Sequence, residues 1–182
     1  DEERIKVLEA ARRIRSELVA SGLRVVLDER EGTSPGFKFN DWEMRGVPLR
    51  IEIGPKDVAK ENVVLARRDT PGKGGKSFVP QAGISEAVSG ALEAVQKALY
   101  DRALNFRNAN TADPKDFEDF RAAVEKGFAY SFWCGSPECE RRIKEETKAT
   151  TRCIPFDGPD GVGECIYCRK PASEKAYFAK AY

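Results

Sequence analysis

The chain has no histidine among its 182 residues. Histidine is the commonest general base and a frequent zinc ligand, so chemistry that needs an imidazole in either role is not in this chain. No apolar run approaches the ~20 residues of a membrane-spanning helix, and the opening residues, DEERIK, do not have the pattern of a secretory signal. We therefore expect a cytoplasmic protein with no membrane partner.

The sequence also lacks an excess of charge of either sign. Its 31 Lys and Arg residues nearly balance 30 Asp and Glu residues, which gives a formal net charge of +1. There is no basic field over the whole protein, so any contact with RNA must come from a local cluster of cations. The candidates for such a cluster are Arg45, Arg50, Lys56, Arg67, Arg68, Lys73 and Lys76.

The hydrophobic pattern predicts a layered α/β domain with a mixed sheet. On the helix that begins near Ile84, Leu99 and Phe106 continue the apolar side, so we expect both to be buried. The expected helices are 3–21, 37–45, 84–108 and 116–126, and the expected strands are 24–29, 47–53, 63–68, 77–80, 128–133 and 150–156.

A turn-rich stretch, NANTADP at 108–114, indicates a domain boundary. We therefore predict two domains, residues 1–109 and residues 110–182. The first would be the α/β layer and the second a small α+β domain that contains all five cysteines.

Residues 36–57, GFKFNDWEMRGVPLRIEIGPKD, concentrate aromatic and charged side chains beside a predicted strand. A short helix before the strand would bring Phe39, Glu43 and Arg50 within reach of one another. Lys56 and Asp57 would lie on the turn after the strand, while Phe37 and Trp42 are interpreted as core. An exposed ring beside cations and carboxylates suits the reading of an unstacked RNA base. A charged strand edge on an ordinary α/β domain is the alternative.

The cysteines form two close pairs and one single residue. Cys134 and Cys139 are spaced C-x4-C, and Cys165 and Cys168 are spaced C-x2-C. Four thiolates fill a tetrahedral Zn²⁺ shell and leave no open position, so the spacing predicts a structural zinc site. Buried or redox-active thiol pairs are the alternative. The fifth, Cys153, is expected to be a small buried hydrophobe.

The segment KFNDWEMRGVPLRIEIGPKD at 38–57, with VVLARRDT at 63–70, resembles the anticodon-binding domain of prolyl-tRNA synthetases of the archaeal and eukaryotic type. ATTRCIPF at 149–156 and the terminal YFAKAY at 177–182 resemble the C-terminal zinc domain of the same family. In that family an apolar strand precedes the first helix seen here, so we expect the sheet to be one strand short with an exposed edge.

The resemblance implies a role for each residue of the candidate site. It implies that Phe39 stacks on one of two adjacent guanines of the proline anticodon, and that Glu43 and Asp57 accept from guanine N–H groups. Arg50 and Lys56 would contact base edges or phosphate. Further phosphate contacts are expected from Arg67 and Arg68.

For the second domain, the family implies a four-cysteine zinc site formed by Cys134, Cys139, Cys165 and Cys168. Basic neighbours at 141, 142, 169 and 170 are expected to offset the negative charge of such a centre. The terminus is expected to dock as a strand that ends in the exposed carboxylate of Tyr182.

The parent enzyme implied by the resemblance is a class II proline–tRNA ligase. No class II catalytic motif is visible in this sequence, so ATP, Mg²⁺ and the aminoacylation chemistry would belong to a catalytic domain outside it, and this portion alone would be inactive. The expected partners are proline tRNA and that catalytic domain. The whole enzyme would be a homodimer, and this portion a monomer.

Two other readings of the sequence stay open. One is a regulatory or protein-interaction module that reuses the fold. The other is the anticodon domain of a glycyl-, threonyl- or histidyl-tRNA synthetase, which would share the fold without the four-cysteine lobe.

Overall fold

The computed structural model describes residues 2–159 and 161–181. The chain forms two compact units that meet between Arg102 and Ala103, within helix α4 (Ile84–Ala109). The α/β layer and the small α+β domain that the sequence indicates are confirmed. The mixed sheet is found in the second unit, whereas the strands described for the first unit pair only antiparallel. The boundary at 109/110 coincides with the end of α4 and stays a prediction. Among the described residues, no helix has the length and apolar content needed to cross a membrane.

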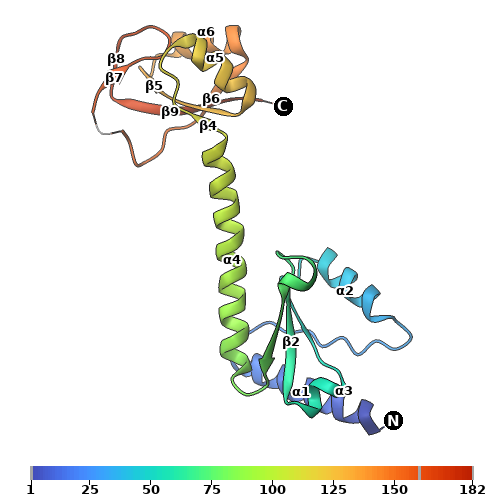
Figure 1. The fold of residues 1–182 in the computed structure, drawn as a ribbon. Helices are drawn as coiled ribbons and strands as arrows, with labels where there is room; N and C mark the ends of the chain where they lie inside the picture. Colours follow the sequence, from blue (N-terminus) through green and yellow to red (C-terminus); the bar gives the residue numbers. More distant parts are fainter. Residues whose placement is uncertain (1, 160, 182) are drawn as a thin grey trace. The chain divides into compact units, whose positions relative to one another are not determined.

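The first unit is built around an antiparallel sheet with the strand order β1-β2-β3 (Figure 1). Ile51 lies opposite Leu65, which in turn lies opposite Ser77. Besides the start of α4, its elements are α1 (Glu2–Ala20), α2 (Pro35–Met44), β1 (Leu49–Glu52), α3 (Pro55–Ala59), β2 (Asn62–Arg67), the 3-10 turn η1 (Gly72–Gly75) and β3 (Lys76–Pro80).

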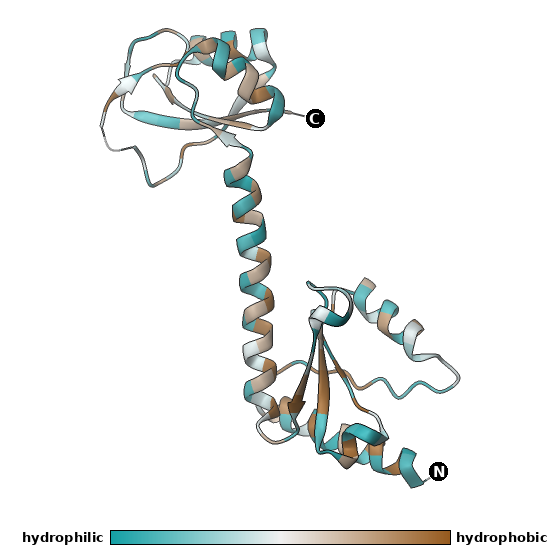
Figure 2. Ribbon diagram, viewed as in Figure 1, coloured by the Kyte–Doolittle hydropathy of each residue, from teal (hydrophilic) through white to brown (hydrophobic). Residues whose placement is uncertain are grey.

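One face of this sheet forms the core. Leu18 on α1 and Val88 on α4 pack with Val63 and Leu65 of β2, and the alternate residues of β1 lie against the same cluster. The strands are accordingly among the most apolar segments of the unit (Figure 2). Because side chains alternate along a strand, the other residues of β1, β2 and β3 reach the opposite face.

Helix α2 is stabilised by its N-terminal cap rather than by fully buried side chains. Ser34 caps it, since its hydroxyl accepts a hydrogen bond from the Phe37 N–H at 3.3 Å, and Pro35 occupies the first turn, where a missing N–H costs nothing. No residue of α2 is fully buried. The expectation of Phe37 as core is therefore wrong, because its side chain is 60% exposed, whereas Trp42 is half-buried.

The strand predicted at 24–29 is also wrong. Residues 23–30 have no strand partner in the described structure, although Leu23 and Val25 pack against the core and Val26 is exposed. The alternation is that of a strand, but a strand also needs a neighbour for its backbone hydrogen bonds. In the part of the chain that the structure describes, β1 and β3 are the edges of the sheet.

The buried face predicted for α4 is correct only over its first half. Val88 and Val95 are buried, but Leu99 and Phe106 are 39% and 69% exposed. The apolar period continues beyond the point where the first unit offers a surface to cover it, so periodicity alone overestimates burial.

The second unit has a four-stranded mixed sheet with the order β4-β5-β9-β6, in which β4 and β5 are parallel and the other pairs antiparallel. Phe120, Val124, Ile143 and Phe178 form its core. Its elements are β4 (Thr111–Ala112), α5 (Phe117–Lys126), β5 (Phe128–Trp133), α6 (Pro137–Thr147), β6 (Ala149–Cys153), β7 (Gly163–Glu164), β8 (Pro171–Ala172) and β9 (Glu174–Lys180).

The predictions for the terminal segment, for Tyr182 and for Cys153 have different outcomes. The terminal segment does dock as a strand, β9, which pairs with β5 and β6. Tyr182 and its carboxylate lie outside the described residues. Cys153 is exposed rather than buried, because it lies at the end of β6 beyond a register shift that follows Thr151.

Candidate nucleic-acid interface and metal centre

The face of the first sheet that points away from the core carries two rows of side chains across the three strands. The strand register aligns Arg50, Ala66 and Lys76 in one row. It aligns Glu52, Val64 and Phe78 in the next. We call these six residues the outer sheet face. Helix α2 lies next to it, because Phe39, Trp42 and Glu43 line a shallow pocket together with Arg50, Ala66 and Arg68.

Arg50 is the centre of the polar contacts in this pocket. Its Nη1 donates to Glu43 Oε1 at 2.6 Å, and its Nε and Nη2 donate to Glu52 Oε1 at 3.1 and 3.0 Å. Its guanidinium carbon lies 3.9 Å from the centroid of the Phe39 ring. The predicted proximity of Phe39, Glu43 and Arg50 is therefore confirmed.

Glu52 connects the two edges of the outer sheet face. Its Oε2 accepts from Lys76 Nζ at 2.8 Å while its Oε1 accepts from Arg50. Burial raises the pKa of Glu52, but the hydrogen bonds from Lys76 and Arg50 outweigh it, so the pKa lies below its ordinary value. The carboxylate therefore stays charged at neutral pH and fixes two cations.

Lys56 and Asp57 are not part of this pocket. They lie in the first turn of α3, which is found at the end of the sheet opposite α2 (Figure 1). The Asp57 carboxylate accepts the N–H of Gly54 at 2.9 Å and so caps that short helix. The predicted turn after the strand is thus a helical turn, and one oxygen of Asp57 already has a structural use.

The two arginines at the end of β2 differ in their surroundings. Arg67 donates to both oxygens of Asp69, at 3.0 and 2.7 Å, and to the carbonyl of Ala94 on α4 at 3.3 Å. Arg68 is exposed and lines the pocket beside Phe39. Arg68 is therefore better placed than Arg67 for an anionic ligand.

Sequence reasoning missed Phe78 as a member of this surface. Its side chain is 73% exposed although it lies in a strand. The alternation along β3 was available as a signal, but only the register with β2 shows that Phe78 and Arg50 share one face.

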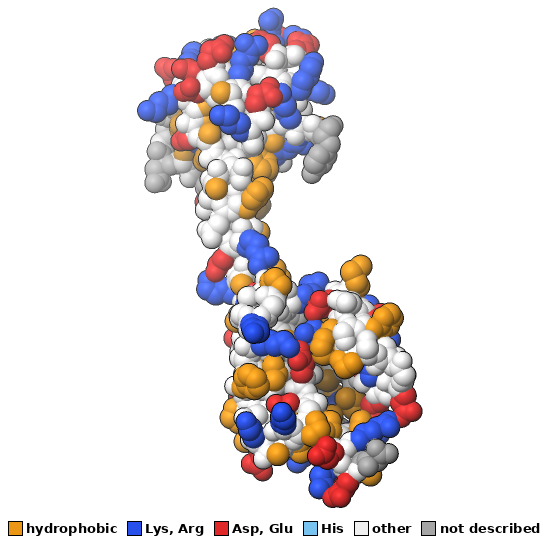
Figure 3. Space-filling model, turned by 45° about the vertical axis from the view of Figure 1, so that its right-hand side comes forward, with side chains coloured by type: hydrophobic (Ala, Val, Ile, Leu, Met, Phe, Trp, Pro, Cys, Tyr) orange, Lys and Arg blue, Asp and Glu red, His pale blue; other side chains and the backbone are white. Residues whose placement is uncertain are grey.

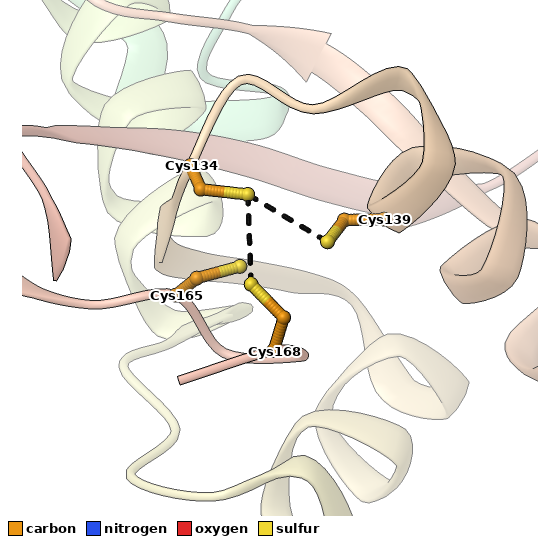
Figure 4. A group of neighbouring side chains, drawn as sticks. All are labelled: Cys134, Cys139, Cys165 and Cys168. Carbon is orange, nitrogen blue, oxygen red and sulfur yellow. Dashed lines mark hydrogen bonds between the residues drawn. The ribbon is translucent and has the colours of Figure 1, made fainter. Parts of the chain in front are cut away.

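The second unit brings the four paired cysteines together, as predicted (Figure 4). Their sulfur atoms all lie within 4.8 Å of one another, and Cys134 Sγ lies 3.6 Å from Cys139 Sγ and 3.7 Å from Cys168 Sγ. A tetrahedral zinc centre with Zn–S bonds of ~2.3 Å needs sulfur atoms about 3.8 Å apart. The arrangement can therefore hold a metal ion after small adjustments.

Two tight turns present these thiols. Gly135, which follows Cys134, has φ +72°, and Arg169, which follows Cys168, has φ +61°. The second turn is closed by the Cys165 N–H, which donates to the Lys170 carbonyl at 2.8 Å, and by the Arg169 N–H, which donates to the Cys165 carbonyl at 3.0 Å. A left-handed conformation at a non-glycine residue such as Arg169 costs of order 1 kcal/mol. This conformation closes the turn that brings the thiols of Cys165 and Cys168 to the same side.

The thiols differ in acidity. The backbone N–H of Lys170 lowers the pKa of Cys168 to about 7. Burial and the neighbouring cysteines raise the pKa of Cys139 to about 12, and burial raises that of Cys165. A cation between the sulfurs reverses this effect of burial, because it favours every thiolate.

The basic residues expected to offset the charge of this centre are partly used elsewhere. Arg141 pairs with Glu138 and Glu145, and Arg142 pairs with Glu138. The carboxylates of α6 thus neutralise these two arginines.

Comparison with known proteins gives matches over both units. A family model described as "Anticodon binding domain" matches residues 2–90, and one described as "Prolyl-tRNA synthetase, C-terminal" matches residues 117–182. The proline–tRNA ligase of Chloroflexus aggregans is 52% identical over 182 residues, which cover 100% of this chain and 38% of that protein. That of Roseiflexus sp. is 50% identical with the same coverage. The chloroplastic/mitochondrial proline–tRNA ligase of Arabidopsis thaliana is 42% identical over 186 residues, which cover 100% of this chain and 34% of the plant protein.

The fold and the first match place residues 2–90 in the class of anticodon-binding domains. The second match and the curated relatives narrow the class: the chain belongs to the prolyl-tRNA synthetase family, of which it carries the anticodon-binding and C-terminal domains. It spans 38% of the length of its bacterial relatives named above.

Proposed function

We propose that this chain reads the two adjacent guanines in the anticodon of a proline tRNA. The observation that carries the proposal is the contact of Arg50 with both Phe39 and Glu43 beside the outer sheet face. A guanine presents acceptors at O6 and N7 and donors at N1 and N2. A carboxylate next to a guanidinium offers the complementary groups.

The Arg50–Glu43 ion pair suits exchange for a guanine. Each partner would give up one hydrogen bond to the other and gain one to the base, so no buried charge is left unpaired. Glu52 would keep holding Arg50 during the exchange. The base would stack on the half-buried Phe39 ring or on the guanidinium plane, since aromatic rings and guanidinium planes both bind unstacked bases.

Lys56 and Asp57 keep a role in this proposal as a separate contact. They would meet the neighbouring nucleotide at the end of the sheet where α3 lies. Arg68 would contact phosphate, and Arg67 is the weaker candidate because Asp69 and α4 already bind it. The two contact groups can be tested one at a time because they lie apart.

The whole protein is proposed to be a proline–tRNA ligase. In this proposal ATP, Mg²⁺, proline and the aminoacylation reaction belong to a catalytic domain beyond the residues described here, and this portion alone does not form prolyl-tRNA. We further propose a cytoplasmic homodimer for the whole enzyme and a monomer for this portion.

The test of anticodon reading is binding to a proline-tRNA anticodon stem-loop, compared with a loop in which both guanines are changed. Arg50→Ala should reduce the preference between the loops by about 5- to 150-fold, the range for a bidentate base contact worth ~1–3 kcal/mol. Arg12→Ala is the matched control, because Arg12 lies on α1 and pairs with Glu29. Salt must be fixed, since phosphate contacts dominate affinity.

Equal binding of the two loops by the unchanged protein would contradict the proposed reading. Absence of any RNA binding by a folded, metal-loaded sample would favour a protein-interaction module instead, for which Phe37 and Met44 offer exposed apolar side chains on α2.

We also propose that Cys134, Cys139, Cys165 and Cys168 hold a structural Zn²⁺ ion. Support comes from the four-sulfur donor set and its near-tetrahedral spacing. A bound zinc would supply no reaction there but would tie two turns into one lobe. Elemental analysis should give one zinc per chain, Cys139→Ser should lose most of it, and Cys153→Ser should keep it because Cys153 lies outside the cluster. Zinc retention by Cys139→Ser would contradict the assignment.

A further inference from the structure

We propose that Phe78 is a second base-stacking ring, which binds a nucleotide next to the one held at Phe39. The inference rests on the proposed function, because it takes single-stranded RNA as the ligand. It concerns a residue to which neither the sequence pattern nor the family resemblance gave a role.

The first observation is the exposure of Phe78. A phenyl ring in a strand is normally packed, yet this side chain is 73% exposed on the edge strand β3. Apolar side chains of this kind lie among cations and carboxylates on the surface of the first unit (Figure 3). The ring contributes little to the fold, so it is available to contact a ligand.

The second observation is continuity with the Arg50 pocket. Phe78 is opposite Val64, and the adjacent row of the same face runs from Lys76 through Ala66 to Arg50. Two strand spacings separate Arg50 from Lys76, which is about 10 Å. The residues between them in these rows, Val64 and Ala66, are only 7% and 6% exposed.

The third observation is the charge around the ring. Lys76 is next to Phe78 on this face, its side chain is 40% exposed, and Lys73 lies on the preceding turn. The carboxylate nearest to it in the rows, Glu52, already accepts from both Lys76 and Arg50. A ring with one cation beside it, a second cation on the preceding turn and a satisfied carboxylate suits a base with its phosphate, because single-stranded nucleic acids bind to stacking rings in basic grooves.

The geometry therefore assigns different tasks to the two ends of the outer sheet face. The Arg50 end, next to Phe39 on α2, reads guanine edges through Arg50 and Glu43. The Phe78 end stacks on the base on the other side of that guanine from the nucleotide assigned to Lys56 and Asp57. It does so without choosing the base, because every base has a π face.

The experiment compares Phe78→Ala with Phe78→Trp in binding to both anticodon stem-loops at fixed salt. Phe78→Ala should weaken binding to both loops by the same factor, roughly 5- to 150-fold for one lost stack, and leave their ratio unchanged. Phe78→Trp should retain binding. Phe106→Ala is the matched control, since Phe106 is 69% exposed on α4 and outside this face.

A fluorescent base such as 2-aminopurine beside the guanines gives a direct readout. Its emission should be quenched on binding to the unchanged protein and less so with Phe78→Ala. Unchanged affinity and quenching in Phe78→Ala would overturn the inference, as would a loss of the ratio alone, which would make Phe78 a support for Arg50.

Failure of the proposed function is distinguishable from failure of this inference. If the unchanged protein binds both loops equally, guanine reading fails, while the effect of Phe78→Ala still decides the stacking role. If it binds neither loop, both proposals fail.

Discussion

At the scale of single residues, the ring of Phe132 leaves no room for a side chain at Gly163. A Cβ atom built on Gly163 would lie 2.3 Å from the Cδ2 atom of that ring, which is closer than side-chain carbons approach. We expect Gly163→Ala to lower the free energy of unfolding of the second unit by about 1–3 kcal/mol, because the ring has to leave its rotamer. Gly158→Ala is the control, since nothing lies within 4 Å of its Cβ position. Equal thermal unfolding midpoints for the two variants would contradict the close contact.

Asp28, in the extended segment before α2, anchors this helix through a hydrogen bond. It accepts a hydrogen bond from Trp42 Nε1 at 2.9 Å and a bidentate contact from Arg30, and Arg30 also pairs with Asp41 at 2.9 Å. We expect Asp28→Asn to cost about 1–3 kcal/mol, as for hydrogen bonds to a charged group. Amide hydrogen exchange should accelerate within α2. Glu29→Gln should leave α2 unchanged, because Glu29 binds Arg12 instead.

The unchanged protein and Asp28→Asn also test the titration of Asp28. The hydrogen bond from Arg30 holds the pKa of Asp28 well below its ordinary value. A depressed pKa stabilises the fold at pH values above the unfolded-state pKa near 4, and this contribution is lost as the pH falls toward the folded-state pKa. The difference in unfolding free energy between the unchanged protein and Asp28→Asn should therefore be constant above about pH 4 and shrink below it. A constant difference down to pH 2 would show that Asp28 is not the titrating group.

At the scale of elements, the local signals in the sequence predicted most of the structure. Alternation predicted β1, apolar and aromatic runs predicted β2 and β5, and the cysteine spacing predicted the four-sulfur cluster, because all of these depend on residues a few positions apart. The exposure of Phe37, the separation of Asp57 from Arg50 and the shared face of Arg50 and Phe78 depend on how distant segments pair. The extended segment at 23–30 shows the same limit, since its pattern is that of a strand but no strand adjoins it among the described residues.

Strand β9 is the element on which the second unit depends. It lies between β5 and β6 and carries Phe178, which is fully buried. A chain that ends at Ser173 should therefore lose the fold of this unit, because the sheet is divided and its core exposed. A chain that ends at Lys180 should keep it. Dispersed amide resonances for residues 103–173 in the shorter chain would contradict the role of β9.

At the scale of the whole molecule, the two proposed sites belong to different units. The outer sheet face lies within the first unit, and the four thiols lie within the second. The second unit has a core of its own around Phe120 and Phe178, so a metal would add stability there without acting on Arg50 or Phe39.

Removal of the metal should therefore loosen the second unit and leave the RNA affinity of the first unit unchanged. With a strong chelator, amide exchange should accelerate in the turns around Cys134 and Cys168 and in β7 and β8, while β1 and β2 keep their protection. Affinity for the anticodon stem-loop should change by less than about twofold, because two sites that share no partner contribute independently to the free energy. The control is the chelator added to Cys139→Ser, which should respond neither in exchange nor in affinity. A large loss of RNA affinity on chelation of the unchanged protein would mean that the second unit contributes contacts to the RNA, and the interface would have to extend beyond the outer sheet face.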